Sequence, residues 1–234
     1  MKIVKRYPYR ELERITRSDG VRHYVDPDTG EHLPSVTTVL SSTADKRALL
    51  EWREWLGDKK ADAVRDEACA LGTLMHTHLE CHIAGTPRPR GSNLIRVLAQ
   101  HMADQIINNG LCHIDEVYAS EEILYYPGLC AGTVDGVVSF KSDCPFDIEL
   151  GVPTIIDFKT AKKMKERKDI TDYLTQVAAY GMCHNHLYST NINQAIIFMV
   201  DRDKKYKEFI VKEDDFEFFQ SQWLNRLDQY YAKQ

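Results

Sequence analysis

The first forty residues contain short β-prone runs separated by polar turn sequences. Residues 9–40 look extended, with SDG at 18–20 and DPDTG at 26–30 between the runs of β-forming residues. Such sequences favour turns, because glycine tolerates positive φ and proline fixes φ. We therefore expect a small β-hairpin in this region.

Apolar residues then recur at helical spacing, and three helices are predicted over residues 41–60, 61–83 and 93–108. Ser41, Ser42 or Thr43 is expected to cap the first helix. The segment GTPRPRGS interrupts the chain after the second helix, and the pair Asn109-Gly110 is a typical stop for the third. The apolar positions of the first helix include Leu49, Leu50, Trp52 and Trp55.

The second half of the chain is rich in β-branched and aromatic residues. Three successive runs, 117–126, 132–140 and 153–160, are predicted to form a meander of strands. They are followed by a helix over 172–186, strands over 192–201 and 205–212, and a closing helix capped by Asp214 or Asp215. This order predicts a single α/β domain over residues 1–234, with a mixed central sheet flanked by helices and a helical N-terminal part.

The composition, 43% hydrophobic and 28% charged, is typical of a soluble globular protein. The net charge of -5 does not indicate nucleic-acid binding, although a cleft that binds nucleic acid needs only local positive charge. None of the six cysteines forms a CxxC pair, which argues against a zinc ribbon. The start of the chain has no apolar run, and no segment approaches the roughly 20 apolar residues of a membrane span. We therefore expect a cytoplasmic protein with reduced thiols and no membrane partner.

Asp157 and Lys159 are the strongest candidates for chemistry. They lie two residues apart in the strand TIIDFKT, so both side chains are expected on one face and Phe158 on the other. A carboxylate can bind a divalent cation while the adjacent ammonium positions water or stabilises charge on phosphate. Asp135, in GTVDGVV on the preceding strand, is expected to converge on the same metal. A few oxygen ligands with open positions suit Mg²⁺ or Mn²⁺.

The alternative interpretation is an ordinary surface ion pair, because the D-x-K pattern is common in strands. Asp157, however, follows the apolar pair Ile155-Ile156, so it is expected where a buried strand emerges. An unpaired charge is costly there, which favours a metal or a partner.

The helix after the Asp157 strand carries Gln176 and Tyr180. These residues are four apart and share one helical face, where both can hydrogen-bond phosphate or water. Simple packing of Tyr180 is the alternative. On an earlier helix, LGTLMHTHLECH, His76 and Glu80 share a face in the same way.

Together, these residues resemble the PD-(D/E)XK nuclease superfamily, and within it the RecB-like exonuclease branch. That branch has a GTxxH helix, a GxxD strand, a DxK strand and a QxxxY helix, in this order. The chain has GTLMH ending at His76, GTVD ending at Asp135, DFK at 157–159 and QVAAY at 176–180. The segment PSVTTVL at 34–40 is also similar to mitochondrial genome maintenance exonuclease and related phage exonucleases.

The resemblance implies a restriction-endonuclease-like core and a set of metal ligands. His76, Asp135, Asp157 and the main-chain carbonyl of Phe158 would hold the metal, and Lys159 would assist the attacking water.

Other residues receive supporting roles from the same resemblance. Gln176 and Tyr180 would orient the DNA strand or Lys159, and Glu80 would support the metal ligands. Some relatives hold an iron–sulfur cluster through one early and three late cysteines. The last cysteine here is Cys183 and no late cluster exists, so we predict no iron–sulfur cluster.

The densest basic stretch, KTAKKMKERKD at 159–169, leads from the DxK strand into the Gln176 helix. It is expected to meet backbone phosphates, with a solvated loop as an equal alternative. The DNA-binding candidates in it are Lys162, Lys163, Lys165, Arg167 and Lys168. Arg88 and Arg90 are weaker candidates, at the border of a passage for a strand.

The sequence thus predicts a Mg²⁺-dependent exonuclease that acts on single-stranded DNA or DNA ends. Replication, recombination or repair in a bacterial or phage-infected cell is the expected context, with replication or recombination proteins as further partners. Three alternatives remain. They are an endonuclease on the same fold, a zinc hydrolase that uses His76, His78 and His82, and a nuclease-like fold that only binds DNA.

Overall fold

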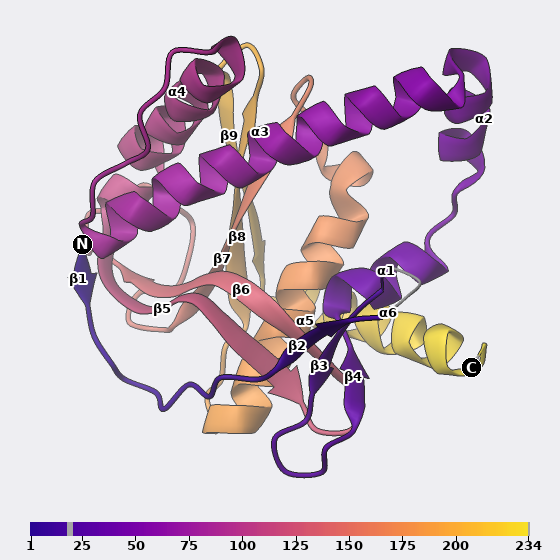
Figure 1. The fold of residues 1–234 in the computed structure, drawn as a ribbon. Helices are drawn as coiled ribbons and strands as arrows, with labels where there is room; N and C mark the ends of the chain where they lie inside the picture. Colours follow the sequence, from indigo (N-terminus) through magenta and orange to yellow (C-terminus); the bar gives the residue numbers. More distant parts are fainter. Residues whose placement is uncertain (18–20, 234) are drawn as a thin grey trace.

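The computed structural model describes residues 1–17 and 21–233, and its central element is a six-stranded mixed sheet (Figure 1). In spatial order the strands are β1 (Lys2–Ile3), β5 (Ile114–Tyr126), β6 (Cys130–Phe140), β7 (Thr154–Ala161), β8 (Gln194–Asp201) and β9 (Tyr206–Lys212). The β1–β5 and β7–β8 pairs are parallel and the other pairs are antiparallel. The predicted meander of three strands is confirmed as β5, β6 and β7.

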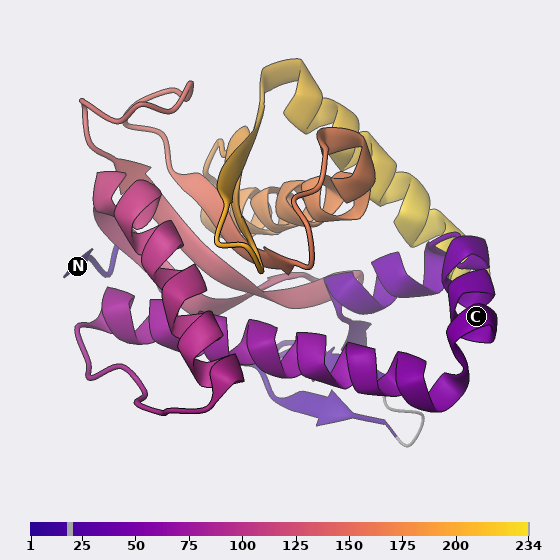
Figure 2. The ribbon, with the colours of Figure 1, turned by 90° about the horizontal axis from the view of Figure 1, so that it is seen from above.

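Helices cover both faces of this sheet (Figure 2). On one face lie α3 (Asp58–Ala84) and α4 (Leu94–Asn109), and on the other lie α1 (Val36–Thr43), α5 (Thr171–Tyr188) and α6 (Glu213–Tyr231). The remaining helical segments are α2 (Arg47–Leu56), η1 (Leu111–His113) and η2 (Arg167–Ile170). The predicted α/β architecture, with a mixed central sheet, flanking helices and a helical N-terminal part, is confirmed. Among the described helices, none combines the length and apolar character needed to cross a membrane.

A hydrophobic core lies on each face of the sheet, and β7 contributes side chains to both. Ile155 packs in the core beneath α5, whereas Ile156 and Phe158 pack in the core beneath α3 and α4. This alternation follows from the two-residue period of a strand. Every residue of β8 is buried, because helices cover both faces of the sheet at its centre.

A smaller antiparallel sheet precedes the helices. It contains β2 (Arg14–Thr16), β3 (Arg22–Val25) and β4 (His32–Pro34), so the predicted hairpin is confirmed. The expected SDG turn lies outside the described residues. The DPDTG turn forms because the Asp26 carboxylate accepts hydrogen bonds from the main-chain nitrogens of Asp28 and Thr29. Gly30 closes the turn at a φ of 76°.

The prediction of an extended chain up to residue 40, followed by a cap at 41–43, was wrong. The helix α1 already begins at Val36, and the Ser35 hydroxyl caps it by accepting from Thr38 N. Val36, Val39 and Leu40 are buried at helical spacing, and this burial outweighs the weak helix propensity of valine and threonine. Residues 41–43 therefore form the last turn of α1.

The cap of the closing helix also differs from the prediction. The N-cap of α6 is Lys212, whose side chain makes no capping hydrogen bond. Asp214 and Asp215 lie in the first turn, where their charge is favourable beside the helix N-terminus.

The long helix α3 positions the site through its C-terminal half. Its buried residues there, Leu71, Met75, Leu79 and Ile83, pack in the same core as α4. The helix α2 lies at the N-terminal end of α3 (Figure 1). The N-terminal half of α3 buries only Ala61, and α2 buries no residue.

Candidate active site

The site forms where β6 and β7 part. The two strands pair only from Gly136–Ile156 to Val138–Thr154. Asp135 and Asp157 are the next residues on each strand beyond the Gly136–Ile156 pair. The prediction that Asp135 and Asp157 lie on neighbouring strands is therefore confirmed. The two residues lie at the fork, where the pairing of β6 with β7 ends.

Side chains replace the missing strand pairing at Phe158. Its main-chain N–H donates to Asp135 Oδ2 over 2.6 Å, and its carbonyl oxygen lies 3.0 Å from His76 Nε2. A carbonyl can only accept, so His76 donates from Nε2. In the neutral ring this leaves the lone pair of Nδ1 free, and Nδ1 lies 3.8 Å from Asp135 Oδ1. The imidazole is thus oriented to offer Nδ1 to a ligand.

His76 reaches the fork because of its place on α3. Met75 and Leu79 are fully buried in the core with α4, which fixes the rotation of the helix. His76 is the next residue after Met75, so its side chain is turned toward the sheet and contacts the Phe158 ring edge-on.

Glu121 of β5 is a site residue that sequence reasoning missed. It lies between the cross-strand pairs Ser120–Gly136 and Glu122–Val134, and so opposite Asp135. Its φ of 57° falls in the left-handed region, which is uncommon for residues other than glycine. Strain of this kind costs about 1–3 kcal/mol and is found most often at functional sites. The sequence ASEEILYY offers two adjacent glutamates, and only the pairing of β5 with β6 shows which of them faces Asp135.

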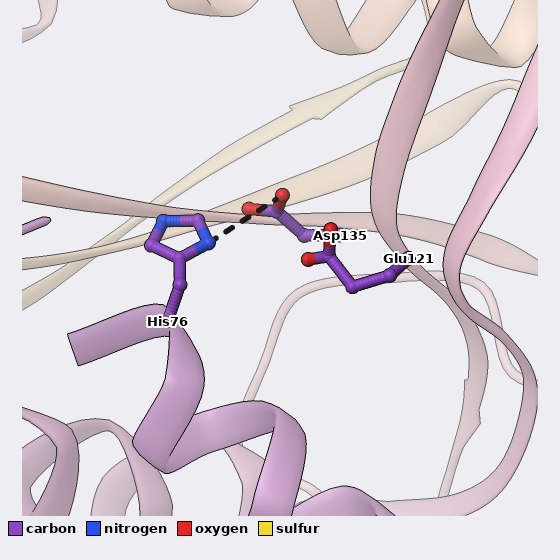
Figure 3. A group of neighbouring side chains, drawn as sticks. All are labelled: His76, Glu121 and Asp135. Carbon is purple, nitrogen blue, oxygen red and sulfur yellow. Dashed lines mark ion pairs between the residues drawn. The ribbon is translucent and has the colours of Figure 1, made fainter. Parts of the chain in front are cut away.

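His76, Glu121 and Asp135 form a group with metal-binding geometry. Their ligand atoms all lie within 4.8 Å of one another, and the side chains converge from α3, β5 and β6 (Figure 3). Partial loss of its water raises the pKa of Glu121 to about 8, and the negative charges of Asp135 and Glu80 act in the same direction. A divalent cation would relieve this repulsion. One imidazole and two carboxylates are a suitable donor set, so these residues fit such an ion.

Asp157 and Lys159 form a buried ion pair next to this group. Lys159 Nζ lies 2.6 Å from Asp157 Oδ2. Burial raises the pKa of Asp157, and the Lys159 charge opposes this shift. Burial alone would lower the pKa of Lys159, but the negative charges of Asp157 and Asp135 outweigh it and raise that pKa. The ammonium therefore stays protonated at neutral pH.

The packing agrees with the prediction that Phe158 and Lys159 point to opposite faces of β7. Phe158 lies in the core under α3 and α4, whereas the Lys159 ammonium lies 5.0 Å from the ring centroid of Tyr173 on α5. Asp157 does not belong to the group of three ligands, and Phe158 O is hydrogen-bonded to His76. Metal ligation by Asp157 and by the Phe158 carbonyl remains a prediction.

Gln176 and Tyr180 lie behind the fork on α5. Gln176 Nε2 donates to Tyr180 Oη over 3.0 Å, and both residues are buried. Burial raises the pKa of Tyr180 well above its usual value, and the carboxylates Asp157 and Asp135 raise it further. The phenol packs against Gly132 of β6, where an added Cβ atom would lie 3.3 Å from its hydroxyl oxygen.

The basic stretch is less free than its sequence suggests. Arg167 is occupied by an ion pair with Asp215 and a hydrogen bond to Ile210 O. The Lys165 ammonium lies 5.0 Å from the ring centroid of Tyr173. The exposed basic residues of the stretch are Lys162, Lys163 and Lys168. DNA binding by the five basic residues remains a prediction.

The three histidines of the zinc alternative do not converge. His78 is buried and accepts a hydrogen bond from Arg88 Nε over 3.3 Å, while Arg88 also pairs with Asp104 at 2.7 Å. Within the described part of the chain, the grouping of potential ligands includes His76 but neither His78 nor His82. The contacts with His78 and Asp104 also occupy the Arg88 guanidinium within the protein.

Comparisons with known proteins return only distant similarities. Neither a protein-family model nor a curated protein matches the sequence. Among solved structures, the chain is similar to an exonuclease candidate from Eubacterium rectale, with 10% identity, a TM-score of 0.48 and coverage of 70% of this chain. The match spans 65% of that protein.

Two further structures show weaker similarity. An alkaline exonuclease from Laribacter hongkongensis is 16% identical with a TM-score of 0.37, over 68% of this chain and 76% of that one. The protein SSO0001 is 13% identical with a TM-score of 0.33, over 69% of this chain and 85% of that one.

Proposed function

We propose that this chain is a metal-dependent nuclease that hydrolyses DNA phosphodiester bonds as an exonuclease. The observation that carries the proposal is the β6–β7 fork, where His76, Glu121 and Asp135 converge beside the buried pair of Asp157 and Lys159. Residues of this kind, crowded at the end of a buried strand, are expensive to maintain without a functional reason.

The three convergent residues would hold a divalent cation, and ligation of the same ion by Asp157 of β7 is part of this proposal. The ion would neutralise charge on the scissile phosphate and lower the pKa of a water molecule. Oxygen-rich ligation favours Mg²⁺ or Mn²⁺ over zinc.

Lys159 has an electrostatic role in this mechanism. Because Asp157 and Asp135 raise the pKa of Lys159, its charged ammonium form is favoured at neutral pH. It positions the attacking water and stabilises charge on the phosphate. The water gives up a proton to solvent as its oxygen bonds to phosphorus, the bond to the leaving sugar oxygen breaks, and that oxygen takes up a proton from solvent.

The preference for single strands or ends, and a role in replication, recombination or repair, are part of this proposal. The exposed side chains of Lys162 and Lys163, directly after β7, and of Lys168 in η2 support it, because they can meet backbone phosphates.

The test is degradation of end-labelled single- and double-stranded DNA with Mg²⁺ or Mn²⁺. Asp157→Asn and Lys159→Ala are each expected to lower kcat by about 100-fold or more, because each removes a charge next to the reacting phosphate. Lys207→Ala is the matched control, since it removes an ammonium whose ion pair with Glu166 lies on the surface. Near-normal activity in Asp157→Asn would show that the active site lies elsewhere. Cleavage of covalently closed circles would identify an endonuclease.

A further inference from the structure

A cavity of about 590 Å³ lies between the β2–β3 hairpin and α1. Among the described residues that line it, Arg22 and Lys46 are basic and none is acidic. Six of the others carry a hydroxyl group, and they are Thr16, Ser35, Thr37, Thr38, Ser41 and Ser42. Cationic and hydroxyl side chains are the groups that bind the phosphates of nucleic acids, so this lining suits a phosphate.

The two basic side chains of this cavity are available to an anion. Arg22 and Lys46 are both exposed, and neither forms an ion pair with another residue in the described ranges 1–17 and 21–233. Asp45, the acidic neighbour of Lys46 in the chain, pairs with Arg47 instead. Lys46 precedes α2, and its side chain makes no capping hydrogen bond there.

The hydroxyl groups divide into those that serve the helix and those that do not. Ser35 accepts from Thr38 N as the cap of α1, and Ser42 donates to Val39 O. Thr16 and Ser41 are exposed, and the described part of the chain offers no hydrogen bond to either hydroxyl. The cavity therefore has hydroxyl donors to spare in addition to its two cations.

A second, shallower hollow of about 330 Å³ leads from this cavity toward the candidate active site. Ser41 and Lys46 line both, so the two are continuous. The hollow reaches α5 at Tyr173, whose ring centroid lies 5.0 Å from the Lys159 ammonium. A path thus runs from Lys159 past Tyr173 to the basic cavity.

The hollow differs in character from the cavity. Its two carboxylates are each neutralised, since Asp45 pairs with Arg47 and Asp172 pairs with Arg226. Leu49, which is 51% exposed, adds apolar surface beside the aromatic ring. Apolar and aromatic surface suits bases and sugars, whereas the hydroxyl-lined cavity suits the phosphates of the same strand.

We propose that the cavity of Arg22 and Lys46 binds a backbone phosphate of the DNA strand, away from the scissile bond, and that the strand passes Tyr173 between Lys159 and this cavity. This inference rests on the proposed nuclease function and adds a site that holds the substrate outside the active site. Contacts to phosphate do not read bases, so the site binds DNA without sequence preference.

The first measurement is binding of labelled single-stranded DNA to the full chain in chelator, where metal-dependent hydrolysis does not interfere. Arg22→Ala and Lys46→Ala are each expected to raise Kd about fivefold. Each should also lower the slope of log Kd against log salt concentration by about 0.7, because one phosphate contact is lost. Arg22→Lys, which keeps the charge, should retain the wild-type slope.

The control is Arg96→Ala, which removes an exposed arginine from α4 on the other face of the sheet. It should leave both Kd and the slope unchanged. Thermal unfolding verifies that all variants are folded.

A second measurement locates the phosphate. Strands that carry one uncharged methylphosphonate linkage, placed at successive positions, are bound to the wild type and to the double variant Arg22→Ala/Lys46→Ala. For the wild type, the substitution at one or two adjacent linkages away from the scissile bond should raise Kd about fivefold. The double variant should be insensitive at those linkages, because the charges that meet them are gone.

The outcomes separate this inference from the proposed function. If the wild type degrades DNA but Arg22→Ala and Lys46→Ala bind it like Arg96→Ala, the phosphate site is disproved and the nuclease stands. The expected binding pattern without degradation in Mg²⁺ or Mn²⁺ would retain the phosphate site and overturn the nuclease. If the folded wild type neither binds nor degrades DNA, both proposals fail.

Discussion

At the scale of single residues, Gly132 explains how Tyr180 can lie so close to the sheet. A Cβ atom at Gly132 would lie 2.8 Å from Tyr180 Cε1 and 3.3 Å from its hydroxyl oxygen. Tyr180 is buried and holds Gln176 through its hydroxyl, so it has little room to move. The GxxD motif thus has a packing reason for its glycine, three residues before Asp135.

The glycine positions yield a matched pair of stability predictions. Gly132→Ala is expected to destabilise the protein by about 1–3 kcal/mol, because the new methyl group overpacks the contact with Tyr180. Gly72→Ala on α3 meets only Thr160 Oγ1 at 3.7 Å and should stabilise by about 0.5–1 kcal/mol through helix propensity. Urea denaturation measures both. Equal effects of the two substitutions would contradict the packing argument.

At the scale of elements, the N-terminal arm of residues 1–9 is anchored to α5 by a buried histidine. His184 Nε2 lies 3.0 Å from Tyr9 Oη, and His184 Nδ1 lies 2.8 Å from Thr190 Oγ1. The Tyr7 ring lies edge-on to the same imidazole. Burial lowers the pKa of His184 to about 4. The arm is thus held against α5 by a ring that must stay neutral.

This contact predicts a loss of stability in acid. The unfolded state binds a proton at His184 below about pH 6.5, whereas the folded state binds it only near pH 4, so stability falls as the pH falls between these values. The contribution is on the order of 3 kcal/mol. Chemical denaturation of wild type and His184→Gln at pH 7 and pH 4.5 measures it. The variant should be less stable at pH 7 and lose much less stability in acid. His101→Gln, at an exposed position, should follow the wild type; a His184→Gln curve parallel to the wild type would refute the assignment.

At the scale of the whole molecule, the metal-binding group links α3 to β5 and β6. The helix α3 is distant in the sequence from the β5–β6 hairpin, so a bound ion would hold the helix layer against the sheet. Without an ion, Glu121 has its pKa raised to about 8, and folding therefore becomes less favourable as the pH rises from about 4.5 toward 8.

Metal-linked stability follows from this arrangement. At a free Mg²⁺ or Mn²⁺ concentration about 100-fold above its Kd, the wild type should gain about 2.7 kcal/mol, or roughly 5–10 °C in Tm. Glu121→Gln should lose most of that gain. In chelator at pH 8 the same variant should be more stable than the wild type, because it removes the repulsion between Glu121 and the neighbouring carboxylates. The gain should be only on the order of 1 kcal/mol, since solvent screens the exposed carboxylate. Differential scanning calorimetry measures both effects. A metal response of full size in Glu121→Gln would exclude this residue as a ligand.

Much of the fold was predictable because its signals are local. The strand runs 117–126, 132–140 and 153–160 are rich in β-branched residues, and α5 follows them at the predicted place. Local signals failed at α1, where Thr37, Thr38 and the following serines are poor helix formers. Burial of Val36 and Val39 against other helices decides that segment, and such burial is invisible in the local sequence.

The sequence by itself determined the chemistry of each motif: an acidic and a basic residue two apart on β7, a carboxylate on β6 and a histidine on a helix. These follow from residue type and from the period of a strand or helix. Only the tertiary structure decided that β6 and β7 part beside Asp135 and Asp157, and that Asp135 and His76 take over the hydrogen bonds of Phe158. Only the pairing of β5 with β6 places Glu121, rather than Glu122, opposite Asp135. Only the folded chain brings the N-terminal arm beside β5 and α3, where the three enclose a cavity. The physical reason is that strand pairing and helix docking bring together residues far apart in the chain, and their distances depend on packing that no local pattern encodes.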